Sequence, residues 1–148
     1  MKTAIVAIGG NALVVDADHG SIRNQFDAAH QISGSILAMV RGGWTVVVTH
    51  GNGPQVGFIL RRADLVRQRA PELPQIGLEI AVADSQGGIG HIIATELLNA
   101  LRREGVDRQV AAVVTHVLVD ADDPAFTTPT KPIGSWYTRE RALELERT

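Results

Sequence analysis

Apolar residues recur along the chain in two spacings, which predict strands alternating with helices. Three short runs, at 3–8, 44–49 and 109–119, are rich in β-branched residues and do not alternate with polar positions. This pattern is typical of strands that are buried on both faces of a sheet. Apolar residues three or four positions apart predict helices over 24–40, 56–69 and 76–103, and a short amphipathic tail follows at 138–146. Glycines inside 76–103 leave open whether it forms one long helix or two abutting ones.

This order of elements predicts the fold class. Strands that alternate with helices are joined by right-handed crossovers, and they form a largely parallel sheet with helices on both faces. We therefore expect an α/β protein, a three-layer α/β/α sandwich with an open sheet. The length of 148 residues suits one domain, and the sequence shows no internal repeat or clear interdomain linker.

Composition and charge narrow the classes of function. Hydrophobic residues make up 45% and charged residues 20%, as in a folded soluble chain. A net charge of -2 gives no broad positive field for nucleic acid or an anionic membrane. There is no cysteine, the first apolar run ends too early for a signal-peptide core, and none approaches the ~20 residues of a membrane span. We expect a cytoplasmic protein without nucleic-acid or membrane partners.

Two glycine-rich turns follow the first two predicted strands, GGNAL at 9–13 and HGNGP at 50–54. Ligands of open α/β sheets bind beyond the carboxyl ends of the strands, where exposed N–H groups at helix starts favour anions. Asn11 and Asn52 each add a neutral amide that can donate to an anionic oxygen or accept from an NH2 group. Pro54 fits the first turn of the next helix. The two turns predict a site for a small ligand that carries both anionic oxygens and an NH2 group.

Ordinary turns and a metal site are the alternative interpretations of the polar and glycine-rich motifs. Gly-Gly and Asn-Gly also form ordinary turns, and neither turn matches a phosphate loop or a dinucleotide fingerprint. Asp120, Asp122 and Asp123 suggest a metal site, but Pro124 and Ala125 break the calcium-loop pattern. We expect these aspartates to form a turn and a helix cap, and we expect no metal site in this chain.

Four motifs together resemble carbamate kinase, of the amino-acid-kinase superfamily: AIGGNAL, VVTHGNGPQVG, DSQGGIG and DPAFTTPTKPIGSWYT, in that order. The resemblance runs from Lys2 to about Arg141 but covers only the N-terminal part of such an enzyme. It implies the reaction ATP + carbamate ⇌ ADP + carbamoyl phosphate, with ATP/ADP and Mg2+, usually in a homodimer and commonly in arginine breakdown.

The resemblance also implies how the chain is organised. Residues 1–148 would form the N-terminal substrate-binding lobe of an amino-acid-kinase fold, with a protruding subdomain beginning near 124–148. The nucleotide lobe would be absent. The chain alone should then be inactive and should expose apolar surface, which favours dimerisation or poor solubility.

The resemblance assigns roles residue by residue. Gly9, Gly10 and Asn11 would face the transferred phosphoryl group, Gly51, Asn52 and Gly53 would hold carbamate, and Lys131 would be the catalytic lysine. Phosphoryl transfer needs positive charge over spread oxyanions, which gives the lysine its chemical reason. A solvated surface lysine is the alternative, but prolines at 129 and 132 stiffen the segment around it.

Ser85 belongs to the third motif and would bind substrate, although glycines such as Gly87 there favour close helix packing, within the lobe or across a dimer, over ligand contact. His91 stands where the family often carries a tyrosine, so the acceptor substrate stays open. The alternatives are a kinase of another small carboxylate or phosphonate, and a non-catalytic anion-binding or interaction module.

Overall fold

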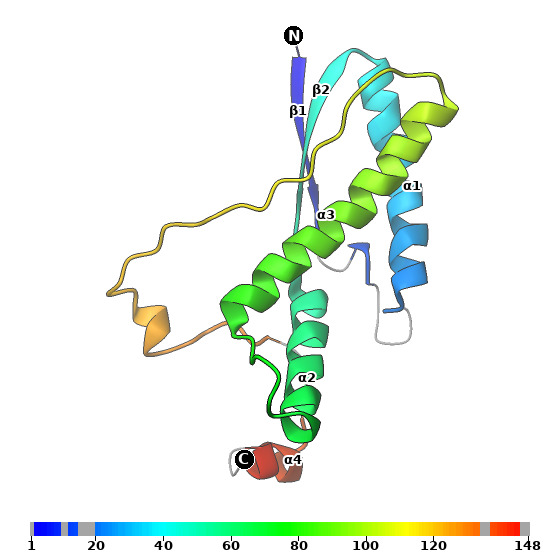
Figure 1. Ribbon diagram of the computed structural model, residues 1–148. Coiled ribbons are helices and arrows are strands. Elements are labelled where there is room, and N and C mark those ends of the chain that lie inside the picture. Colours follow the sequence, from blue (N-terminus) through cyan, green and yellow to red (C-terminus); the bar gives the residue numbers. More distant parts are fainter. Residues whose placement is uncertain (1, 10–11, 15–19, 134–136, 146–148) are drawn as a thin grey trace.

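Two parallel strands and the helices beside them form the fold of the computed structural model, which describes residues 2–9, 12–14, 20–133 and 137–145. Strands β1 (Lys2–Ile8) and β2 (Trp44–His50) pair in parallel along their whole length. The helices are α1 (Ile22–Arg41), α2 (Gly53–Arg69), α3 (Leu78–Arg103), the short 3-10 helix η2 (Pro124–Phe126) and α4 (Arg139–Leu145) (Figure 1). The α/β class and the parallel strands predicted from the sequence are confirmed.

The sheet is covered on one face in the described part of the chain. Side chains alternate across a strand, and Val6, Ile8 and Val48 lie on the face that packs against the helices. On the opposite face Ile5 is 74% exposed and Val47 47% exposed. The layer of helices expected on this second face is not formed by the described residues.

Helices α1 and α3 pack together and carry most of the core. A first cluster lies where they meet the end of β1, and a second lies near the other end of the two helices. The first contains Ile8, Leu13, Ala29, Ile89, Ile92 and Ile93, and the second Ile36, Leu37, Leu97, Ala100 and Leu101. This packing fixes the direction of α3, on which one residue of the candidate site lies.

Side-chain and glycine signals set the helix ends. Ser21 caps α1 by accepting from the Asn24 N–H at 3.1 Å, which starts the helix two residues before the apolar spacing predicted. Gly105 has a φ of +64° just after α3, and the Val106 N–H donates to the Leu101 carbonyl at 2.9 Å. Only glycine adopts this left-handed conformation at little cost, so it ends the helix here.

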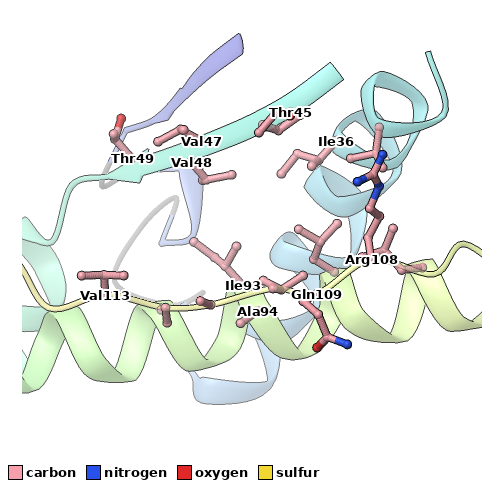
Figure 2. A pocket seen from close by; sticks show the side chains of 18 of the residues that line it. Ile36, Thr45, Val47, Val48, Thr49, Ile93, Ala94, Arg108, Gln109 and Val113 are labelled. Carbon is pink, nitrogen blue, oxygen red and sulfur yellow. The ribbon is translucent and has the colours of Figure 1, made fainter. Parts of the chain in front are cut away.

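The third predicted strand, 109–119, is wrong: the segment after α3 forms no strand, and its later part runs away from the packed elements (Figure 1). Its first part lies along α3, and an open cavity of about 890 Å³ separates it from β2 (Figure 2). In place of a ladder, Gln86 on α3 accepts from the Thr115 N–H at 2.8 Å. Beyond this contact Val117 is 80% and Leu118 100% exposed. An apolar run indicates burial, but it does not supply the neighbour that a strand must pair with.

The remaining helices agree with the sequence pattern. The segment predicted at 76–103 is a single helix, so its glycines do not divide it. Most of the described part of the amphipathic tail forms the helix α4. No described helix combines the length and the apolar character that crossing a lipid bilayer requires.

Candidate functional site

The turn at residues 51–52 joins the end of β2 to α2 and lies beside the end of β1. Ile8 pairs with His50 in the register, and the Gly51 N–H donates to the Ile8 carbonyl at 2.9 Å. Gly9 follows Ile8 directly, so the described parts of both glycine-rich turns leave the same edge of the sheet. The His50 ring contacts the turn: its Nδ1 lies 3.2 Å from the Gly51 carbonyl oxygen.

The start of α2 offers hydrogen-bond donors that the described residues do not use. Asn52 is the N-cap, and the first helical bond runs from the Val56 N–H to its carbonyl at 3.0 Å. The N–H groups of Gly53 and Gln55 make no hydrogen bond within the described ranges. Pro54 has no N–H to leave unpaired, as the sequence predicted. Free N–H groups at a helix start attract an anion.

Space is open around the two glycines. A side-chain carbon built at Gly9 or at Gly53 would meet no atom of the described residues within 4 Å. Packing within the protein therefore does not demand glycine at either position. The missing side chains leave room for a small molecule beside the backbone, as a binding turn requires.

A chain of hydrogen bonds fixes the Asn52 side chain. Its Nδ2 donates to Ser85 Oγ at 2.9 Å, and the Ser85 hydroxyl donates to the Val82 carbonyl at 2.6 Å. Ser85 is 2% exposed, while Asn52 is half-buried. A residue from the second glycine-rich turn, HGNGP, and one from the third motif, DSQGGIG, are thus in direct contact, although 33 positions separate them.

A buried pair of glutamines lies next to the site and was missed in the sequence analysis. Gln25 donates through Nε2 to the Gly20 carbonyl at 3.2 Å, and Gln55 donates through Nε2 to Gln25 Oε1 at 3.3 Å. Gln25 is 3% and Gln55 7% exposed, and Gln55 Oε1 has no hydrogen-bond partner in the part of the chain that the structure describes. The available signal was Gln25, four residues before the buried Ala29 and therefore on the core-facing side of α1.

Other predicted residues are not brought to the turn. Lys131 lies in an exposed stretch after η2, and no hydrogen bond or ion pair joins it to the turn in the part of the chain that the structure describes. Gly10 and Asn11 lie outside the described residues. Asp120 and Asp123 have the turn and capping roles that the sequence predicted: the Asp120 carboxylate accepts from the Asp122 N–H within a turn at 3.0 Å, and Asp123 caps η2 by accepting from the Ala125 N–H at 2.8 Å.

Several known proteins are similar to this chain along almost its whole length. No family model matches the chain. The carbamate kinase-like protein YahI of Escherichia coli K12 is 43% identical over 146 residues, which cover 99% of this chain and 46% of that protein. The carbamate kinase of Pyrococcus furiosus is 40% identical over 146 residues, with the same two coverages.

A solved structure gives the same result. The Giardia carbamate kinase superimposes with a TM-score of 0.84 at 34% identity, covering 94% of this chain and 46% of that one. The Giardia lamblia enzyme has also been solved with bound AMP-PNP. The chain spans about half the length of the relatives it matches, consistent with the N-terminal part of such a protein.

Proposed function

From its homology to carbamate kinases, we propose that this chain supplies the carbamate- and phosphoryl-binding lobe of a carbamate kinase. The reaction would be ATP + carbamate ⇌ ADP + carbamoyl phosphate. The observation that carries this proposal is the turn at the start of α2, where free N–H groups, a fixed carboxamide and open space occur together. A carbamate kinase that is 40% identical to the chain supports the same activity.

The chemistry of carbamate fits this turn. Carbamate is a small planar anion, and the N–H groups of Gly53 and Gln55 at the start of α2 would donate to its carboxylate oxygens. Gly51, Asn52 and Gly53 would hold the carbamate. Gly9, together with Gly10 and Asn11, would face the phosphoryl group as it moves. Ordered N–H donors stabilise developing negative charge without having to reorganise during the reaction.

Lys131 would supply the positive charge that the transferred phosphoryl group requires. Its segment, 127–133, lies outside the packed core, so the lysine would reach the reacting oxygens by movement of this segment. We propose that this segment is the start of a protruding subdomain near 124–148.

ATP or ADP and Mg2+ would be held mainly by a nucleotide lobe outside these 148 residues. The chain covers 46% of its carbamate kinase relatives, and no group of three His, Asp or Glu side chains gathers as metal ligands in its described part. The 148-residue chain tested alone should therefore bind carbamoyl phosphate without turning it over. We further propose a cytoplasmic homodimer in arginine metabolism.

Two arms test the proposal. In the first, the chain is titrated with carbamoyl phosphate by calorimetry, and saturable binding is expected. In the second, the chain is fused to the C-terminal half of the Pyrococcus furiosus enzyme, and ATP formation from ADP, Mg2+ and carbamoyl phosphate is expected. Absence of binding contradicts the proposed lobe. Turnover by the chain alone at the rate of a full-length kinase contradicts the division of labour.

One alternative has a specific observation behind it. The relative that is 43% identical is called carbamate kinase-like, so a kinase of another small carboxylate or phosphonate is the second candidate. A non-catalytic anion-binding module would bind carbamoyl phosphate but give no turnover in the fusion.

A further inference from the structure

We infer that Ser85 is a positioning residue that locks the Asn52 carboxamide with its oxygen free, so that the site selects ligands that carry an N–H donor. This inference rests on the proposed function and names the chemical feature by which the same site would recognise its substrate. The acceptor formed in this way would take the NH2 group of carbamate or carbamoyl phosphate.

The hydrogen-bond chain decides which end of the carboxamide faces Ser85. A serine hydroxyl has one hydrogen, and Ser85 uses it on the Val82 carbonyl at 2.6 Å. Ser85 Oγ can then only accept, so the group 2.9 Å away must be the amide nitrogen of Asn52. The reversed carboxamide would place two acceptor oxygens against each other. Asn52 Oδ1 therefore points away from Ser85.

The freed oxygen has no competing partner among the described residues. An N-cap asparagine normally accepts from an N–H in the first turn of its helix, but Asn52 makes no such bond. One of the usual donors is absent, because Pro54 occupies the second helical position. Within the described ranges Asn52 Oδ1 makes no other hydrogen bond. It is an acceptor at the mouth of a turn that otherwise presents donors.

Donors and an acceptor side by side match a ligand with the reverse arrangement. Carbamoyl phosphate carries anionic oxygens and an NH2 group, whereas acetyl phosphate has the same acyl phosphate with a methyl group in place of NH2. An acceptor that faces a methyl group loses its hydrogen bond to water and gains nothing in return. The pair of ligands therefore isolates the proposed contact.

The test is calorimetric titration of the 148-residue chain with carbamoyl phosphate and with acetyl phosphate. The wild-type chain should bind carbamoyl phosphate about 3- to 10-fold more tightly, as expected for one hydrogen bond. In Ser85→Ala the carboxamide can rotate, and the ratio of the two affinities should fall to about 1- to 2-fold. Asn52→Ala should bring the ratio to about 1- to 2-fold as well, because the acceptor oxygen is lost.

Ser33→Ala is the matched control. Ser33 is as buried as Ser85, at 1% exposed, and likewise donates to a carbonyl of its own helix, Ala29, at 2.8 Å. It lies on α1 and has no bond to Asn52, so its substitution should leave the ratio unchanged. Amide spectra of each variant establish that it is folded. If Ser85→Ala does not fold, Asn52→Ala decides, since Asn52 is half-buried and makes no capping bond.

The outcomes separate the two proposals. Equal affinities in the wild-type chain, or a ratio that Ser85→Ala leaves intact, overturn the role of Ser85 while the lobe still binds acyl phosphates. Failure of the wild-type chain to bind either ligand overturns the proposed function and this inference with it.

Discussion

Asn52 at the start of α2 donates to Ser85 Oγ on α3 at 2.9 Å, and this bond ties the turn after β2 to a helix that packs along α1. The turn is therefore held by the core rather than by its own local sequence. The contact brings together two motifs that lie far apart in the sequence.

Asn52 and Ser85 should show coupled contributions to stability. Ser85→Ala leaves the Asn52 amide without its partner and should lower the unfolding free energy by about 1 kcal/mol. In a double-mutant cycle with Asn52→Ala, the coupling should be about 0.5 to 1.5 kcal/mol, measured by urea unfolding. The pair Asn52→Ala and Ser33→Ala should be additive. Additivity of Asn52→Ala with Ser85→Ala would contradict the bond.

The buried pair Gln25 and Gln55 should be tolerated better when both are removed than when one is. Gln25→Leu alone removes the acceptor of the Gln55 carboxamide. It should lower the unfolding free energy by about 1 to 3 kcal/mol, because unpaired buried polar groups keep their desolvation penalty. The double variant Gln25→Leu/Gln55→Leu removes both carboxamides and should be closer to the wild-type chain than Gln25→Leu is. Costs that simply add, measured by urea unfolding, would contradict this.

Gly105 and Gly34 should respond to alanine in opposite directions. Gly105 has a φ of +64°, where a side chain is strained, so Gly105→Ala should cost about 1 to 2 kcal/mol. Gly34 lies inside α1 with open space around it, and Gly34→Ala should stabilise by about 0.5 to 1 kcal/mol. Thermal unfolding of the two variants provides the measurement. A stabilising Gly105→Ala would contradict the role of Gly105 in ending α3.

Lys131 should matter for rate rather than for folding. In the fusion with the C-terminal half of the Pyrococcus furiosus enzyme, Lys131→Ala should lower kcat by about 10²- to 10³-fold, as for loss of one charge-stabilising donor. The control is Lys2→Ala, which changes the chain's other lysine. Lys2 lies 5.6 Å from the Trp44 ring centre at the opposite end of β1, so kcat should stay within about 2-fold. Equal effects of the two variants would remove Lys131 from the mechanism.

The segment after α3 should tolerate charge where it is exposed. Leu118 is 100% exposed, so Leu118→Glu should change the unfolding free energy by less than about 0.5 kcal/mol. It should also reduce self-association in sedimentation velocity, because it interrupts an exposed apolar run. Val110 packs against the second core cluster, and Val110→Glu should destabilise the chain clearly. Unchanged self-association in Leu118→Glu would show that this run does not join copies of the chain.

The sequence predicted those helices and strands that have a strong periodic pattern of apolar residues. The first two strands and the helices α1 to α3 have strong apolar periodicity, and their boundaries were found to within a few residues. The strand predicted at 109–119 failed because its apolar composition does not specify a pairing neighbour, and Gln86 holds Thr115 in its place. Local sequence gives an element's tendency, whereas tertiary contacts decide whether a strand forms.

The candidate site shows the same division. Glycines and asparagines after the strands predicted a binding turn at the carboxyl edge of the sheet, and Gly51 lies beside the end of β1 there. The direction of the Asn52 carboxamide could not be predicted, since it depends on Ser85 and Val82 of another helix. The glutamine pair was equally out of reach, because nothing local to Gln25 indicates Gln55 as its partner.

The buried side chains of the described part all lie between Ile8 and Leu101, in elements that follow one another along the chain. During synthesis this body can assemble as soon as α3 has emerged from the ribosome, before residues 111–133 are needed. The binding turn, anchored by Ser85, would then be shaped while the segment that carries Lys131 is still being made.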